Sequence, residues 1–208
     1  MITLKESILN RSSHGAEGFK EQRRRMIEKW LDEYSIKDYT IKDDFIIDVE
    51  GSVRLLAKNL VELPDYIQFG VVKGNFDCSS NKLTSLKGCP KEVSGFFNCS
   101  YNKLISLEGG PVRVGNSFYC FKNNLMSLEG APEKVIGSFY CHENNITSLK
   151  GSPKEIGEDF DCSYNKLTSL EGAPKEVGGY LDCSNNPTLF SVDDVKKVCQ
   201  VKRSIIVR

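Results

Sequence analysis

Histidine is scarce in this chain of 208 residues: only His14 and His142 occur, and neither lies in a nucleophile, metal or phosphate motif. Net charge is absent too, because 28 lysines and arginines balance 28 aspartates and glutamates. A balanced chain has no overall field to draw it to nucleic acid or an anionic membrane. No apolar run is long enough to span a bilayer, and the first residues lack a secretion signal. We therefore expect a soluble protein that is not an enzyme and has no cofactor or metal ion.

A fixed period dominates the rest of the chain. Six cysteines recur at one constant interval, and an asparagine follows each of them by three positions. These cysteines are Cys78, Cys99, Cys120, Cys141, Cys162 and Cys183. A period of this length indicates that one small unit is stacked repeatedly. The sequence therefore predicts an elongated, mostly β solenoid.

Other columns of the repeat define the expected coil. A large apolar residue precedes each cysteine by two positions, as in Phe76-Asp77-Cys78, which predicts a short strand with its first and third side chains inside. Stacked strands of this kind form one parallel sheet, expected on the concave side. The asparagines should bond the backbone of the adjoining turn. A Gly-x-Pro segment follows and forbids a helix, so the convex side should be a thin, helix-free, polyproline-like run.

The array should begin before the first cysteine of the period. Val53, Leu55, Leu60 and Leu63 repeat the apolar spacing of the next coil, and the step from Val53 to Phe76 is slightly longer than the period. With this degenerate first coil included, residues 51–188 are predicted to form about seven coils.

The two ends are predicted to be caps. Residues 1–50 should form an N-terminal cap, with a helix over residues 16–34 and a hairpin of strands over residues 39–49. The helix should carry one apolar stripe, made of Phe19, Met26, Ile27, Trp30, Leu31 and Tyr34. Residues 189–208 should form a C-terminal cap, with a short helix that begins at Ser191 or Asp193 and a final strand over residues 204–207.

Two chemical features of the sequence have simpler structural interpretations. Stacked strands place inward thiols in single file, whereas a metal needs ligands that converge on one point, so we predict reduced thiols that fill the core. Cys89 and Cys199 lie outside this file and have no catalytic companion in the sequence. The run Arg23-Arg24-Arg25 is interpreted as a solvated helix face rather than a phosphate site, because consecutive helical residues point in different directions.

The outward positions beside the cysteines become aromatic in two middle coils. Tyr119 and Phe121 flank Cys120, and Tyr140 and His142 flank the next cysteine. An exposed aromatic cluster with a polar surround is typical of a protein-binding hot spot. The same rings can also stack across strands and only stabilise the sheet. The predicted partner-binding residues are Tyr119, Phe121, Tyr140, His142, Tyr101, Lys122, Glu143, Tyr164, Phe96 and Tyr180.

The repeat also resembles known families. The spacing apolar-x-Cys-x-x-Asn-x-Leu-x-x-Leu resembles the leucine-rich repeat, with cysteine where leucine is commoner. The residue patterns of segments 160–179 and 39–69 are similar to those of leucine-rich repeat proteins of tailed bacteriophages and prophages. Residues 60–64 also resemble the short repeats of secreted effectors from enteric pathogens.

The phage resemblance implies an accessory protein in the cytoplasm of an infected bacterium. There it would bind a bacterial host protein, such as a defence component, through the concave face. A virion structural component and a secreted effector scaffold are the alternatives. Too few residues follow the last coil for the ubiquitin-ligase domain of such effectors, so the resemblance does not imply an enzyme. The oligomeric state does not follow from the sequence.

Overall fold

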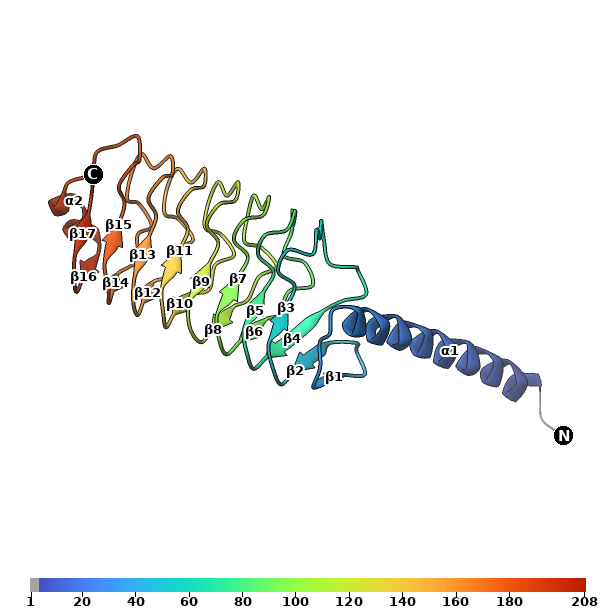
Figure 1. Ribbon diagram of the computed structural model, residues 1–208. Coiled ribbons are helices and arrows are strands. Elements are labelled where there is room, and N and C mark those ends of the chain that lie inside the picture. Colours follow the sequence, from blue (N-terminus) through green and yellow to red (C-terminus); the bar gives the residue numbers. More distant parts are fainter. Residues whose placement is uncertain (1–3) are drawn as a thin grey trace.

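The protein is an elongated solenoid of parallel β-strands with a long helix projecting from one end (Figure 1). The computed structural model describes the backbone of residues 4–208 and the side chains of residues 17–208. Helix α1 covers Leu4–Glu33, and the short helix α2 covers Val192–Val198 near the other end. Between these helices the chain runs through successive turns of the solenoid, which confirms the predicted repeat architecture.

One sheet of eight parallel strands, here called the front sheet, carries the Phe-x-Cys segments. Its register advances by one coil at each step, so that Phe76 pairs with Phe97 and Phe97 with Phe118. The degenerate first coil joins in the predicted register, because Val53 pairs with Phe76. The strands are β3 (Val53–Arg54), β5 (Phe76–Asp77), β7 (Phe97–Asn98), β9 (Phe118–Tyr119), β11 (Phe139–Tyr140), β13 (Phe160–Asp161), β15 (Leu181–Asp182) and β17 (Ile205–Ile206).

A second sheet of nine strands, the back sheet, lies on the return path, where the sequence predicted a thin, polyproline-like run. That prediction was wrong because the preceding coil offers backbone partners: the Lys91 amide, for example, donates to the Gly70 carbonyl at 2.8 Å. Residues 35–190 contain no helix, as predicted. The strands are β1 (Tyr39–Ile41), β2 (Ile47–Val49), β4 (Phe69–Val72), β6 (Glu92–Val93), β8 (Arg113–Val114), β10 (Lys134–Val135), β12 (Glu155–Ile156), β14 (Glu176–Val177) and β16 (Gln200–Val201).

The solenoid has about eight turns, one more than predicted. In the last turn the register from β15 to β17 joins Leu181 to Ile205, a longer step than that from Phe139 to Phe160 in the central coils. Helix α2 occupies this longer turn, and Ser191 caps its first turn by accepting from the Asp194 amide at 3.2 Å. The eighth turn contains no periodic cysteine or asparagine, which are the residues that identify a coil in the sequence. For this reason the sequence predicted one turn fewer.

A continuous column of aromatic rings forms the centre of the core. The fully buried rings of Phe76 and Phe97 stack with centroids 5.6 Å apart, and similar contacts continue to Phe160. At the N-terminal end, Phe69 and then Trp30 of α1 extend the column. All six periodic cysteines are buried and unpaired beside it, as predicted. Burial of each phenylalanine ring stabilises the fold by about 1.5–3 kcal/mol. Burial of each thiol contributes less, because the thiol is a smaller apolar group.

The periodic asparagines form a buried ladder that ties neighbouring coils together. The Asn123 side-chain amide donates to the carbonyls of Cys120 in its own coil and Cys99 in the preceding coil, both at 3.1 Å. Its oxygen accepts from the Leu104 amide at 3.0 Å. The same pattern recurs at Asn102, Asn144, Asn165 and Asn186. The predicted role of asparagine in the turn is confirmed, and it extends across coils as well.

The residue just before each asparagine is strained. Tyr101, Lys122, Glu143 and Tyr164 have φ values from +50° to +53°, the left-handed region that side chains with a Cβ occupy at a cost. Asn185 occupies the same place in the last such coil. Asparagine tolerates this conformation better than most residues.

We therefore expect Tyr164→Asn to raise the free energy of unfolding by about 0.5–1 kcal/mol. Tyr164 is 58% exposed, so little packing is lost. Urea denaturation followed by circular dichroism measures the change. The matched control is Lys166→Asn, two positions on and outside the left-handed column, which should be neutral or slightly destabilising. Equal effects of the two substitutions would contradict the strain argument.

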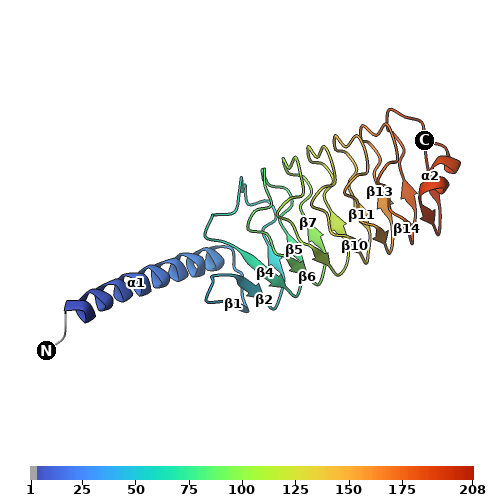
Figure 2. The same cartoon turned by 180° about the vertical axis from the view of Figure 1, so that it is seen from behind.

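The apolar stripe predicted on α1 is only partly buried. Ile27, Trp30 and Leu31 pack into the core, but Phe19 is 66% exposed and Met26 is 43% exposed. The reason is that only the last turns of α1 contact the solenoid, while the rest of the helix extends away from it (Figure 2). The hairpin of β1 and β2 lies beside these last turns, antiparallel as predicted.

Candidate functional site

The outer face of the front sheet shows what an ordinary coil does with its exposed positions. In one such coil an oxygen of Asp77 accepts from the amide of Ser79 at 3.0 Å and from its hydroxyl at 2.6 Å. Asn98 does the same for Ser100. In both coils the side-chain oxygen of the residue two positions before the serine closes a local turn. Few polar atoms of this turn are therefore left without a hydrogen bond.

Two central coils replace this turn with stacked aromatic rings. Tyr119 and Tyr140 stack with centroids 5.5 Å apart and planes 12° apart. Phe121 and His142 stack at 4.5 Å and 11°. The ring of Phe96 contacts Tyr119 edge-on at 6.0 Å, and Tyr101 contacts Phe121 in the same way at 5.4 Å. We call the six residues Phe96, Tyr101, Tyr119, Phe121, Tyr140 and His142 the aromatic patch.

The other predicted site residues lie at the edges of this patch. The Lys122 ammonium sits 4.9 Å from the centre of the Tyr101 ring and 3.4 Å from an oxygen of Glu143. Tyr180 lies beside Tyr140, and burial together with the Tyr140 hydroxyl raises the pKa of Tyr180. Tyr164 is exposed and does not take part in the ring contacts of the patch. The structure thus brings most of the predicted residues together.

Two carboxylates that were not predicted as site residues join the patch from the next coil. The Tyr140 hydroxyl donates to Asp159 at 3.3 Å, and Nδ1 of His142 lies 3.2 Å from an oxygen of Asp161. Burial acts to raise the pKa of Asp161, but His142 and the hydrogen bonds from Ser163 outweigh it and hold that pKa below its ordinary value. In the sequence Asp161 looks like an ordinary member of its column and Asp159 lies in a variable one, so only the contact between coils identifies them.

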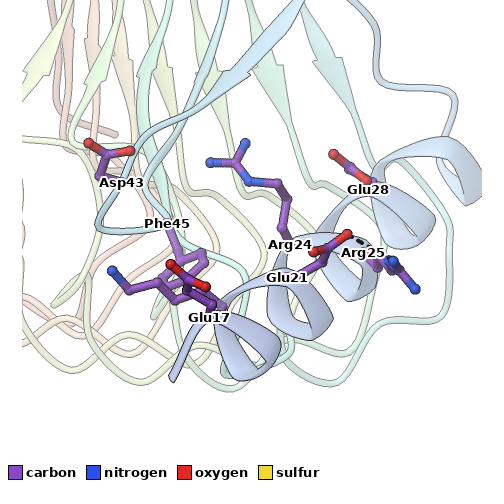
Figure 3. Close-up of a pocket in the computed structure, with 8 residues that line it drawn as sticks. Glu17, Glu21, Arg24, Arg25, Glu28, Asp43 and Phe45 are labelled. Atoms are coloured by element: carbon purple, nitrogen blue, oxygen red, sulfur yellow. Dashed lines mark hydrogen bonds and ion pairs between the residues drawn. The ribbon is translucent and has the colours of Figure 1, made fainter. Parts of the chain in front are cut away.

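A separate groove of about 640 Å³ lies between α1 and the turn of the β1–β2 hairpin (Figure 3). It is lined by charges of both signs, together with Phe45. Two of the three consecutive arginines line the groove, and all three have different partners: Arg23 lies over the Phe45 ring, Arg24 donates to the Ile41 carbonyl, and Arg25 pairs with Glu21. They do not converge on a common point, so the groove has no phosphate-binding arrangement.

The buried thiols are poorly suited to chemistry. Burial raises the pKa of Cys99, Cys120, Cys141 and Cys162 far above the ordinary value, which keeps the sulfur protonated and weakly nucleophilic. No group of three or more potential metal ligands occurs among the side chains that the structure describes. His14 lies outside these side chains. Neither helix in the described part of the chain has the length and apolar character needed to cross a membrane.

The fold defines a repeat protein of the parallel β-solenoid class, with a constant register over its central coils. Comparisons with protein-family models, with curated protein sequences and with solved structures found no match.

Proposed function

We propose that this protein is a binding module of the leucine-rich repeat type, and that the aromatic patch on its front sheet holds a protein partner. The observation that supports this is the replacement of a self-sufficient turn by rings in adjacent coils. Amphipathic rings such as tyrosine supply large contact area at low entropic cost and are enriched in binding hot spots. Catalysis is not proposed, because the patch pairs its only histidine with a carboxylate but offers no nucleophile beside it.

Stabilisation of the sheet alone is a weaker explanation of the patch. The coils that contain Asp77, Asn98 and Asp161 stack in the same register without a ring at either position beside the cysteine. Their turns satisfy the serine hydroxyl locally, so the fold does not require aromatic residues at these positions. Eight strands at about 4.8 Å spacing present a face roughly 34 Å long, which accommodates a standard protein interface of about 800 Å² per partner.

The partner that fits the resemblance of the sequence is a bacterial host protein. On this proposal the chain is a phage accessory protein that acts in the cytoplasm of the infected cell, with a defence component as one candidate target. The proposal for the partner's origin rests on the resemblance, whereas the proposal for the binding surface rests on the geometry of the patch.

Replacing Tyr119 and Tyr140 together by serine should reduce capture of the partner at least tenfold, because both rings of the central stack are removed. The measurement is affinity capture from a bacterial host lysate, quantified by mass spectrometry. The matched control is Ile105→Ser with Met126→Ser, which removes two exposed apolar side chains outside the patch. Circular dichroism checks that each variant is folded. Capture that is equal for both variants, or no specific capture by the wild type, would contradict the proposal.

A further inference from the structure

The aromatic patch is bordered on one side by acidic side chains that form no ion pair with a lysine or arginine of residues 17–208. We call Glu158, Asp159, Asp161 and Asp182 the acidic strip; they lie in the two coils that follow the patch. Among the described side chains no lysine or arginine forms an ion pair with any of the four. Acidic residues elsewhere are commonly paired across coils, as Glu50 is with Lys73 at 2.7 Å. Arg203 lines a hollow together with Glu158 and Asp159 without an ion pair to either, so the region beside the patch keeps an excess of negative charge within a chain of balanced charge.

The ring stack stops where the acidic strip begins. Tyr140 stacks on Tyr119 of the preceding coil, whereas the next coil places Asp161 beside it in the front sheet. Tyr180 adds a second ring near these carboxylates, and its amide donates to Asp159 at 3.0 Å. Asp161 therefore holds the position in the register at which another ring would continue the stack on Tyr140. A ring face next to a carboxylate favours a cation, which the ring quadrupole and the negative charge both attract.

The same surface already contains one complete example of this arrangement. Lys122 lies over the Tyr101 ring at 4.9 Å and pairs with Glu143 at 3.4 Å. Tyr140 and Asp161 repeat the ring and the carboxylate without a lysine or arginine from the described part of the chain. Asp161 faces Nδ1 of His142 at 3.2 Å, and a lysine or arginine at this place would be supplied by another molecule.

We propose that the occupant of the patch is a basic segment of the partner protein, whose arginine or lysine side chains sit against Tyr140 and Tyr180 and pair with Asp161 and Asp182. This inference rests on the proposed function of the patch. Arginine suits the site best, because its planar group stacks on a ring and also bonds a carboxylate in two places. The partner is thus identified by charge as well as by apolar contact.

The chain itself provides a conservative substitution for the test. Asn98 occupies the position of Asp161 in an earlier coil and accepts the same two bonds from its serine, at 3.0 and 2.6 Å. Asp161→Asn and Asp182→Asn therefore remove charge while the turn keeps its acceptor. The matched control is Asp43→Asn with Glu62→Gln, which removes the same charge from exposed positions away from the front sheet.

The probe is a fluorescein-labelled peptide of four Arg-Gly repeats, and binding to the full chain is measured by fluorescence anisotropy at low salt. We expect wild type and control to bind it, the Asp161→Asn, Asp182→Asn variant to bind at least tenfold more weakly, and a peptide of four Glu-Gly repeats not to bind. Equal binding by the variant and the control, or absence of binding by the wild type, would overturn the inference.

Capture from lysate separates this inference from the proposed function. If the Asp161→Asn, Asp182→Asn variant captures the same protein as the wild type while Tyr119→Ser, Tyr140→Ser does not, the patch binds a partner that is not recognised by charge. That result overturns the basic-segment proposal alone. If neither variant loses the captured protein, both proposals fail.

Discussion

Raising the pH from 8 to 11 is expected to unfold this protein steeply, because its core contains a file of neutral thiols. The pKa of each periodic cysteine is raised in the folded state, mainly by burial; for Cys78 a hydrogen bond from its thiol to Cys89 is the largest cause. An unfolded thiol ionises near pH 9, so above that pH the unfolded chain loses protons that the folded chain keeps. The stability that the thiols contribute is therefore complete below pH 9 and is lost as the pH rises.

The expected size of the effect is large. One thiol lowers the free energy of unfolding by about 1.4 kcal/mol per pH unit, so six together lower it by about 8 kcal/mol per unit. This is comparable with the whole stability of an ordinary domain, about 5–15 kcal/mol. Urea denaturation at a series of pH values, followed by circular dichroism, measures the slope.

A variant with two thiols removed provides the control for the alkaline effect. Cys120→Ala with Cys141→Ala should lower stability at pH 7 through lost packing, yet the slope above pH 9 should fall by about one third, since two of six thiols are gone. A slope that is the same in both proteins would show that other groups cause the alkaline unfolding. A stability that stays constant between pH 8 and 10.5 would contradict the thiol argument altogether.

Replacing Asn123 by alanine is expected to cost about 3–5 kcal/mol, a large effect for one polar side chain. The substitution leaves the amide of Leu104 without a partner and removes one of the two ladder hydrogen bonds to each of the carbonyls of Cys99 and Cys120, which keep those from Asn102 and Asn144. One unsatisfied buried amide costs about 1–3 kcal/mol, and each of the two other lost hydrogen bonds costs about 0.5–1.5 kcal/mol. Because these groups belong to adjacent coils, the loss falls on the interface between coils, on which the stability of a repeat protein depends.

Asn124 offers a matched control in the next position. Its side chain is exposed and only its backbone amide bonds the preceding coil, so Asn124→Ala should change the free energy of unfolding by less than about 0.5 kcal/mol. Urea denaturation of the two variants gives the comparison. Similar costs for Asn123→Ala and Asn124→Ala would show that the ladder is not what holds the coils together.

The sequence was sufficient for the interior of the coil because each interior column has one chemical character. Phe118, Cys120 and Leu125 are buried as their spacing predicts, and the same columns are buried in the neighbouring coils. The back sheet was missed because its strands in the central coils are two residues long, as in Lys134–Val135, and too short for alternation to be visible. The partial exposure of the α1 stripe was missed for another reason. Periodicity identifies a face of a helix but not how far along the helix that face is covered.

The candidate site was predicted in part. Tyr119, Phe121, Tyr140 and His142 were expected to be neighbours, because a fixed period places equivalent positions side by side in adjacent coils. The roles of Asp159 and Asp161 were not predicted. Their contacts with Tyr140 and His142 depend on how far a ring side chain reaches across to the next coil, and a period gives positions rather than side-chain conformations.

The constant register of the central coils also has a genetic consequence. Each coil from the second to the seventh presents nearly the same upper and lower surface to its neighbours, since phenylalanine or leucine, cysteine and asparagine recur at the same step. An in-frame duplication or deletion of one repeat, by recombination between its similar copies, would therefore join surfaces that already fit. Such a chain can change the length of its face without building a new junction, and it can move a functional coil relative to the ends while the fold is kept.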